Sequence, residues 1–361
     1  MKSKLLLLFM FCYFLSATPA FAASNSLDLK VITERGVVVS TFGNQSQELT
    51  VKISSGPDAG KTVKMSYDPM SLSSLRLNPG DQLIISKQND ASGKTVFSVN
   101  DRFRIPEVLG VVIAFLFLIL LIAGKKGIGS IIGLGISLGI IFVYIVPSIL
   151  GGTNPLLACM VGAIAILFTT TYIAHGFSRQ TTIAMFSTFI ALILTWALAT
   201  IVTQITSLSG FGTEETYDLH LGLKNLVDFQ GLLLGGIIIA TLGALNDVTT
   251  TQAAAIFEIH RTDPKMNFDQ LLKKGLSVGR EHVVSLINTL VLAFVGTSLA
   301  LFLIYFFNPT GVSLITILNS EIVSEEIIKT IAGTSGLLLA MPIVSILAAF
   351  ICVDIIGEKH K

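Results

Sequence analysis

The chain has 361 residues, of which 52% are hydrophobic and 13% charged, and its formal net charge is +1. This composition is typical of an integral membrane protein, so a lipid bilayer is the expected environment. No basic patch with interleaved aromatic residues occurs, which argues against a nucleic-acid partner. The three cysteines, Cys12, Cys159 and Cys352, form neither a disulfide framework nor a metal-ligand pattern. We therefore expect no metal and no cofactor.

Residues 1–22 have the pattern of a secretory leader. Lys2 and Lys4 precede an apolar run from Leu5 to Leu15, and Ala20-Phe21-Ala22 is a small-x-small cleavage site. The segment is either a signal peptide cleaved after Ala22 or an N-terminal anchor. Both alternatives place the following residues outside the cytoplasm.

Residues 23–105 are polar and have the pattern of a small β domain. Alternating or β-branched stretches are separated by turn signals such as Asn78-Pro-Gly-Asp81. Five strands are predicted, at 31–39, 48–53, 61–65, 82–86 and 94–99. This number in about 80 residues predicts an extracytoplasmic all-β barrel, for which an OB-like fold is one candidate.

Residues 106–355 predict a bundle of seven transmembrane helices, followed by a cytoplasmic tail at 356–361. The predicted spans are 107–123, 128–150, 155–174, 181–203, 230–257, 283–307 and 330–353. The expected fold is thus an α-helical polytopic membrane protein with about seven spans, a leader and a small N-terminal β domain.

The distribution of Lys and Arg predicts the orientation of this bundle. If the β domain is outside, ten of these residues fall on cytoplasmic segments and only two, Lys224 and Lys329, on outer loops between spans. Such a bias is the positive-inside pattern. We expect a multi-pass protein of the inner (plasma) membrane, with the N-terminal domain extracytoplasmic and the C-terminus cytoplasmic.

The segment 258–282 is the longest predicted cytoplasmic loop. Within it, residues 267–282 mix apolar and cationic side chains as in an amphipathic helix on the membrane surface, although Gly275 and Gly279 weaken that pattern. Two further glycine patterns, Gly129-x-x-x-Gly133 and Gly135-x-x-x-Gly139, predict close helix packing in the second span. Gly333-Thr-Ser-Gly336 is either a loop or an unwound start of the seventh span.

The fifth span carries Asn246 and Asp247 near its midpoint. An acidic side chain at the centre of a bilayer costs about 2.5–3.5 kcal/mol on the insertion scale, so it is rarely kept against lipid. At 100° per residue Asp247 and Thr250 share a face with Gly236, Ala240 and Gly243. Ala254 falls on the same face. Small residues line helix contacts in membranes, so we expect this face to pack against other helices or a cavity. Gln252 falls on the opposite, apolar side.

Two interpretations of these polar residues stay open. They are either hydrogen-bonding groups that hold helices together, or an ion, proton or substrate site. The candidate site comprises six residues on the fifth and sixth spans: Asp247, Asn246, Thr250, Thr251, Asn288 and Thr289. Burial would raise the pKa of Asp247 and a bound cation would lower it, so a proton and a cation remain alternatives.

Three blocks of the sequence resemble the YibE/F family of bacterial membrane proteins. They are His175-Gly-Phe-Ser178, the stretch from Leu242 to Ala254, and Gly279-Arg-Glu-His282 with the continuation to Gly296. The resemblance covers residues 30–355 and implies the architecture, the membrane location and at most a permease-like role. Family members often carry an acid at the position of Asn246, so a mechanism with two carboxylates is not expected here.

We predict a permease or transporter of a small solute or ion that uses the intramembrane Asp247. The alternative is a membrane scaffold or envelope-assembly factor whose outer β domain binds a partner. An enzyme is not expected, because the spans contain no nucleophile elbow, zinc helix or acid paired with histidine.

Overall fold

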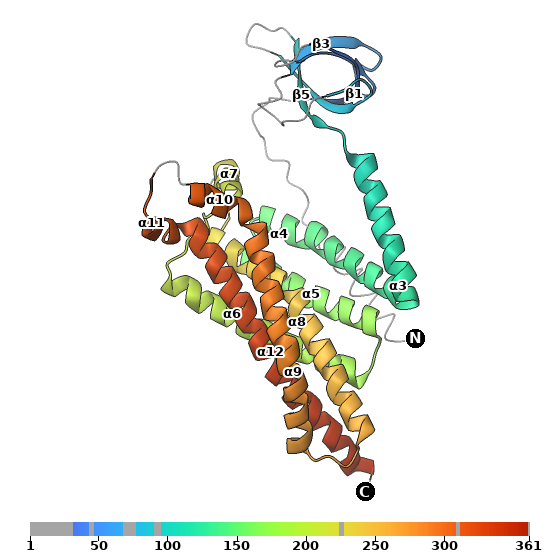
Figure 1. Ribbon diagram of the computed structural model, residues 1–361, viewed down its shortest axis with the longest axis vertical. Helices are drawn as coiled ribbons and strands as arrows, with labels where there is room; N and C mark the ends of the chain where they lie inside the picture. The colour runs from blue at the N-terminus through green and yellow to red at the C-terminus, as the bar shows by residue number, and fades with distance from the viewer. Residues whose placement is uncertain are drawn as a thin grey trace. The chain divides into compact units, whose positions relative to one another are not determined.

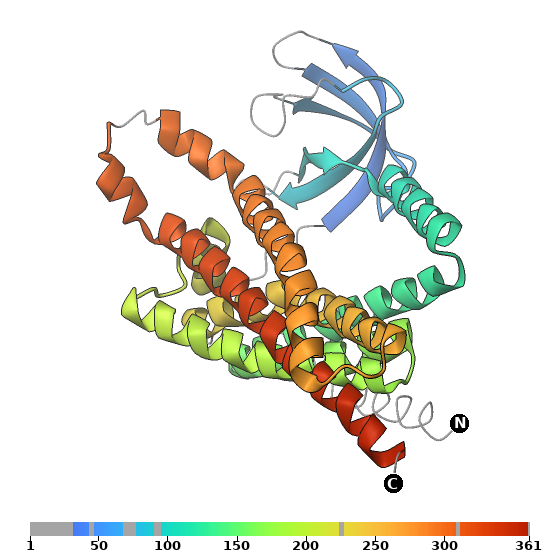
Figure 2. The ribbon, with the colours of Figure 1, turned by 60° about the horizontal axis from the view of Figure 1, so that its bottom comes forward.

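The computed structural model describes residues 32–42, 47–67, 77–89, 95–223, 227–307 and 311–359. The predicted leader, residues 1–22, lies outside the described residues. The chain forms two compact units, one within residues 23–124 and one that contains residues 125–361 (Figures 1 and 2). The first apolar helix therefore belongs to the same unit as the β strands, whereas the sequence placed the domain boundary at residue 105.

The N-terminal unit contains a five-stranded antiparallel sheet. Its strands are β1 (Ile32–Phe42), β2 (Gln47–Ile53), β3 (Thr62–Tyr67), β4 (Gln82–Asn89) and β5 (Thr95–Arg102). Their order is β3-β2-β1-β4-β5, and the edge strands β3 and β5 approach each other, so the sheet curls into a half-barrel. The sheet confirms the predicted all-β domain.

Alternating side chains fill the inside of this curled sheet. Leu49, Val51, Leu83 and Ile85 are each at most 1% exposed. Because successive residues of a strand point to opposite faces, the intervening polar residues lie outside. The sheet thus has a hydrophobic core of its own.

Asp58 fixes the β2–β3 turn to the sheet. Its Oδ1 accepts a hydrogen bond from Lys61 Nζ at 2.6 Å, and its Oδ2 accepts one from Lys87 Nζ at 2.5 Å. The hydrogen bond from Lys61, followed by that from Lys87, lowers the pKa of the Asp58 carboxyl below its ordinary value. The same ion pair raises the pKa of Lys61.

Helix α3 (Ile105–Ile140) changes direction at Gly124, where φ is 55° and ψ is −136°. A positive φ is uncommon for residues that carry a Cβ atom, so glycine suits this position. The first candidate span ends there, and the second begins at Gly127. Helices α3 and α4 (Val146–Leu150) are joined by a π-helical turn, η1 (Ile141–Ile145), just before Pro147. A π turn is one way in which a helix accommodates a local irregularity such as proline.

Within the described part of the chain, seven helices are long and apolar enough to cross a membrane, which confirms the predicted fold class. The helices that follow α4 are α5 (Pro155–His175), α6 (Arg179–Ile205), α7 (Glu214–Leu223), α8 (Phe229–Thr262), α9 (Phe268–Thr297), α10 (Leu299–Phe307), α11 (Leu314–Leu318) and α12 (Glu321–Lys359).

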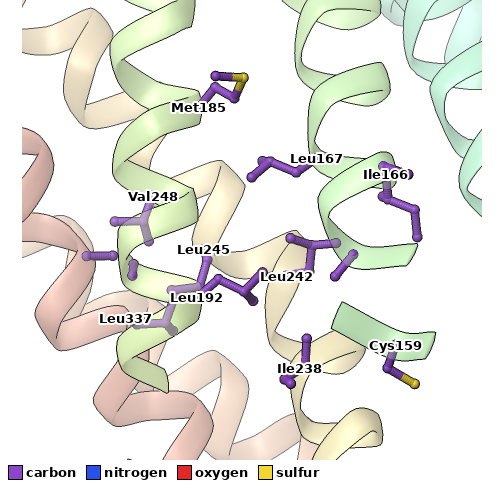
Figure 3. Close-up of a cluster of buried hydrophobic side chains, with 14 of the residues drawn as sticks. Cys159, Ile166, Leu167, Met185, Leu192, Ile238, Leu242, Leu245, Val248 and Leu337 are labelled. Carbon is purple, nitrogen blue, oxygen red and sulfur yellow. The ribbon is translucent and has the colours of Figure 1, made fainter. Parts of the chain in front are cut away.

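Helix α8 is the central element of the bundle. It packs against α5, α6, α9 and α12. Figure 3 shows the largest apolar cluster between these helices, with Leu167 from α5, Met185 and Leu192 from α6, Ile238, Leu242, Leu245 and Val248 from α8, and Leu337 from α12.

Two segments predicted as loops are largely helical. Residues 258–262 belong to α8 and residues 268–282 to α9, which runs without a break into the sixth span. A separate surface helix at 267–282 is thus not present. Residues 321–329 form the first turns of α12 rather than a loop. Apolar periodicity marks where a helix enters lipid, but helices continue beyond that point.

The glycine patterns have different roles. A Cβ atom at Gly129 would lie 3.1 Å from Ile173 O, so this glycine allows close contact with α5, as predicted. Gly135 and Gly139 have no atom within 4 Å of a Cβ and serve no contact in the described chain. The stretch 333–336 is a regular part of α12, and not an unwound end. There Gly333 lies against Thr241 of α8.

Candidate functional site

The face of α8 that carries Asp247 is exposed. Gly236, Ala240, Gly243 and Asp247 are all exposed. A Cβ atom at Gly236 or Gly243 would meet nothing within 4 Å. The prediction that this face packs against other helices is wrong for these four residues, whereas Thr250 and Ala254 of the same predicted face line a pocket. In α8 the larger apolar side chains fill the bundle core, and the small residues leave one side of the helix open.

Gln252, on the apolar side of α8, is buried at a three-helix junction. Its Nε2 donates to Gly275 O of α9 at 2.8 Å and to Ser345 Oγ of α12 at 2.9 Å. Gly275 and Gly279 make room for this contact, since a Cβ atom at Gly279 would lie 2.9 Å from Gln252 Nε2. The glycines that weakened the surface-helix pattern are thus contact points between α9 and α8. Gln252 holds helices together.

Asn246 is held by α5. Thr171 Oγ1 donates to Asn246 Oδ1 at 2.9 Å. Thr171 lies four residues before His175, the last residue of α5, which is about 6 Å along the helix axis. The middle of α8 is therefore level with the end of α5, close to the α5–α6 turn at residues 176–178. Asp247 follows Asn246 at this level.

The Asp247 side chain makes no close polar contact. In the described part of the chain it has no hydrogen-bond or ion-pair partner. Thr250 and Thr251 follow it by one helical turn on α8. The site therefore presents a carboxylate without a direct partner among the described residues.

A pocket of about 250 Å³ lies between α5, α6 and α8, and Asp247 is not among the residues that line it. It is lined by His175, Gln180, Thr181, Ala184, Thr250, Thr251 and Ala254. Ser178 caps the first turn of α6 by accepting from Thr181 N at 3.0 Å, which fixes the α5–α6 turn beside the pocket. Thr250 Oγ1 donates to Asn246 O at 2.8 Å. The pocket thus combines hydroxyl, amide and imidazole groups at the bundle surface.

The two candidate residues on α9 lie elsewhere. Asn288 and Thr289 are exposed, and Thr289 Oγ1 donates back to Ser285 O of its own helix at 3.0 Å. Neither residue lines the pocket. Of the six predicted site residues, Asn246, Asp247, Thr250 and Thr251 gather in one region, while Asn288 and Thr289 do not join them.

A second polar cluster fixes the α6–α7 loop at the opposite end of α6. Glu321 Oε1 accepts from Ser209 N at 2.6 Å and from Gly210 N at 3.1 Å. Glu325, only 3% exposed, accepts from Gly212 N at 2.9 Å. Backbone N–H groups thus neutralise part of the carboxylate charge at the start of α12.

The comparison with protein families gives one match. The model of the YibE/F-like protein family matches residues 111–354. The chain belongs to the YibE/F-like family. This membership agrees with the resemblance found in the sequence, and the matched range of the YibE/F-like model includes the whole candidate site. Comparisons with curated proteins and with solved structures found no match.

Sequence reasoning missed His175 and Gln180, which line the pocket. His175 occurs in a block that resembles the YibE/F family, and that was the signal that could have found it. In the described part of the chain no group of three His, Cys, Asp or Glu side chains could hold a metal ion.

Proposed function

We propose that this YibE/F-like protein is a permease for a small solute or ion, and that Asp247 binds and releases the ion that drives or accompanies transport. The observation that carries the proposal is the carboxylate of Asp247, which has no hydrogen-bond or ion-pair partner in the described chain and precedes the pocket residues Thr250 and Thr251 by one helical turn. Ionisable residues within membrane spans commonly mark ion or substrate pathways. The proposal assigns no catalytic chemistry to the chain.

The energetic argument starts from the exposed face of α8. A carboxylate at the lipid-facing centre of a span would cost about 2.5–3.5 kcal/mol, and Asp247 has no Lys or Arg partner in the described chain. We infer that water reaches Asp247 from the pocket beside the α5–α6 turn, which is lined by Thr250 and Thr251 one helical turn further along α8. Hydration of the Asp247 carboxylate, and exchange of an ion bound to it, then explain why an acidic residue occupies this position of α8.

Ion flux into proteoliposomes tests the proposal. The full chain is reconstituted, and entry of protons, radioactive sodium and radioactive rubidium is compared between wild type, Asp247→Asn and Glu258→Gln. Glu258 is a matched control because it is an exposed carboxylate on the same helix, paired with Arg261 at 2.6 Å. We expect Asp247→Asn to lose flux of one of these ions and Glu258→Gln to retain it. Equal flux in all three proteins would refute the proposal.

A scaffold role for the β unit is the second candidate, and one observation favours it. Val39, Phe42 and Val96 are 52%, 67% and 46% exposed on the strands, and exposed apolar side chains are common in binding surfaces. The two functions separate in a complementation assay. A scaffold requires Phe42 and tolerates Asp247→Asn, whereas a permease requires Asp247 and tolerates Phe42→Ser.

A further inference from the structure

We propose that the transported ion is a small monovalent cation, and that it crosses the bundle along a row of buried threonine hydroxyls between α6, α8 and α12. This inference rests on the proposed permease function and adds the path and the charge of the ion. The hydroxyl row has four members on α6 and two on α8, each at most 4% exposed: Thr181, Thr188, Thr195, Thr203, Thr241 and Thr249.

The members on α6 share one side of that helix. Thr181, Thr188 and Thr195 follow one another at intervals of seven residues, which is nearly two full turns. Thr203 comes eight residues later. At 1.5 Å per residue, the distance along the helix from Thr181 to Thr203 is about 33 Å, close to the thickness of about 30 Å of a bilayer core. The hydroxyl row is therefore long enough to cross the membrane.

Contacts with α8 and α12 enclose the row, and the three helices lie side by side (Figures 1 and 2). Thr188 Oγ1 and Thr249 Oγ1 lie 2.5 Å apart and share a hydrogen bond between α6 and α8. A Cβ atom at Gly336 of α12 would overlap Thr195 Oγ1, so this glycine lets α12 close over the row. Passage of an ion therefore requires α12 to separate from α6.

One end of the hydroxyl row lies at the pocket beside the α5–α6 turn. Thr181 lines this pocket together with Thr250 and Thr251. Asp247 precedes Thr250 by about one helical turn of α8. An ion that Asp247 releases into the pocket is therefore beside the first member of the row.

The other end of the row has an unpaired hydroxyl and a buried acid. Thr203 Oγ1 is buried and has no hydrogen-bond partner among the described residues. A buried polar group without a partner costs about 1–3 kcal/mol, so packing alone does not explain a threonine at this position. Glu325 of α12, at the α6–α7 loop, accepts from Gly212 N at 2.9 Å through Oε1. Its Oε2 lies 3.6 Å from Lys329 Nζ, beyond hydrogen-bond length, and so retains lone pairs for a cation.

The direction of the hydroxyl hydrogens favours a cation over an anion. A hydroxyl has one hydrogen to donate and two lone pairs that accept. Thr195 Oγ1 donates to Ala191 O at 2.7 Å, and Thr241 Oγ1 donates to Ile237 O at 2.8 Å. Their oxygens therefore present lone pairs to the row, and such oxygens can replace the water around a cation, as carbonyl oxygens do in channel filters. Hydronium and alkali-metal ions share this requirement for acceptor oxygens.

Ion flux into proteoliposomes that contain the full chain tests the path. Entry of protons, radioactive sodium and radioactive rubidium is measured for Thr195→Val and Thr203→Val, because valine has nearly the shape of threonine and lacks its hydroxyl. Thr200→Val is the matched control, since Thr200 lies about 140° around α6 from Thr195 and donates back to Trp196 O at 2.9 Å. We expect each row variant to lose about tenfold in the flux of one of these cations, and Thr200→Val and Thr195→Ser to retain it.

The outcomes separate the path from the permease. Undiminished flux of all three cations in Thr195→Val and Thr203→Val, together with a loss in Asp247→Asn, would overturn the path and leave the permease standing. A loss in the two row variants with undiminished flux in Asp247→Asn would overturn the role of Asp247 and support the path.

Labelling with 2-aminoethyl methanethiosulfonate, a small cationic thiol reagent, decides the question where a valine variant does not fold. We expect Thr203→Cys to be modified above the level of wild type, whose Cys159 and Cys352 are buried. Leu194→Cys, on an exposed face of α6, should stay at that level, because a thiol in lipid does not ionise and the thiolate is the reactive form. A Thr203→Cys variant that is modified no more than wild type would overturn the path.

Discussion

The three-helix junction at Gln252 provides the clearest prediction about stability. Replacing Gln252 by Leu keeps the side-chain volume close to that of the native residue, so little cavity is created. The substitution removes the hydrogen bonds to Gly275 O at 2.8 Å and to Ser345 Oγ at 2.9 Å. Both partners remain satisfied, because Gly275 O lies within a helix and Ser345 Oγ also donates to Met341 O at 2.8 Å.

The expected loss of stability in Gln252→Leu follows from the measured range of free energies for such hydrogen bonds. Side-chain hydrogen bonds between membrane helices average about 0.6 kcal/mol and reach about 1.7 kcal/mol. Two bonds with satisfied partners therefore predict a loss of about 1 kcal/mol in the free energy of unfolding, with an upper limit near 3 kcal/mol. A change above about 4 kcal/mol would contradict this reasoning, since it would require an unpaired buried group.

Reversible unfolding in mixed micelles, followed by the fluorescence of Trp196, provides the measurement. A double-mutant cycle of Gln252→Leu with Ser345→Ala isolates the bond between these two side chains. We expect a coupling energy of about 0.6–1.7 kcal/mol. A coupling of zero would show that the two side chains do not hold α8 to α12.

Three further predictions concern other parts of the chain. Labelling of intact cells from outside should modify Lys52→Cys and leave Lys274→Cys unmodified, and the reverse result would overturn the predicted orientation. The lowered pKa of Asp58 contributes stability that is fully present above the pKa of an unfolded aspartate, about 3.9, and is lost as the pH falls through the folded value. Asp58→Asn should therefore be less stable than wild type at neutral pH. On acidification, followed by circular dichroism of residues 23–104, wild type should lose more of its free energy of unfolding than Asp58→Asn does. Glu321→Gln weakens the charge-assisted bonds to Ser209, so amide exchange of residues 207–212 should rise roughly fivefold, and unchanged exchange would refute the role of Glu321.

The sequence predicts where the helices and strands of this fold lie better than it predicts which of their faces are buried. Apolar runs and turn signals locate the seven spans and five strands, because each pattern reflects a local period. The orientation of α8 depends on which neighbours surround it. Gly236 and Gly243 could line a helix contact or leave a surface open, and the local pattern is the same in both cases.

The candidate site shows the same limit. Asp247, Thr250 and Thr251 were found because polar groups within a span are costly wherever they lie. His175 could not be assigned to the site, because its place in the pocket depends on the packing of α5 and α6 against α8. Asn288 was included in the predicted site only because a polar side chain within a membrane span is costly. The structure places it on an exposed face away from the pocket.

The measurement that tests the central claim most directly is ion entry into proteoliposomes, with protons reported by an enclosed pH-sensitive dye under an imposed pH gradient and sodium and rubidium by their radioactivity. Wild type, Asp247→Asn and Glu258→Gln are compared at equal protein content. The account predicts that entry of one of these ions falls at least about tenfold in Asp247→Asn, equivalent to about 1.4 kcal/mol, and is unchanged in Glu258→Gln. Equal entry of protons, and of radioactive sodium and rubidium in the same vesicles, in Asp247→Asn and wild type would contradict the claim that Asp247 takes part in ion transport.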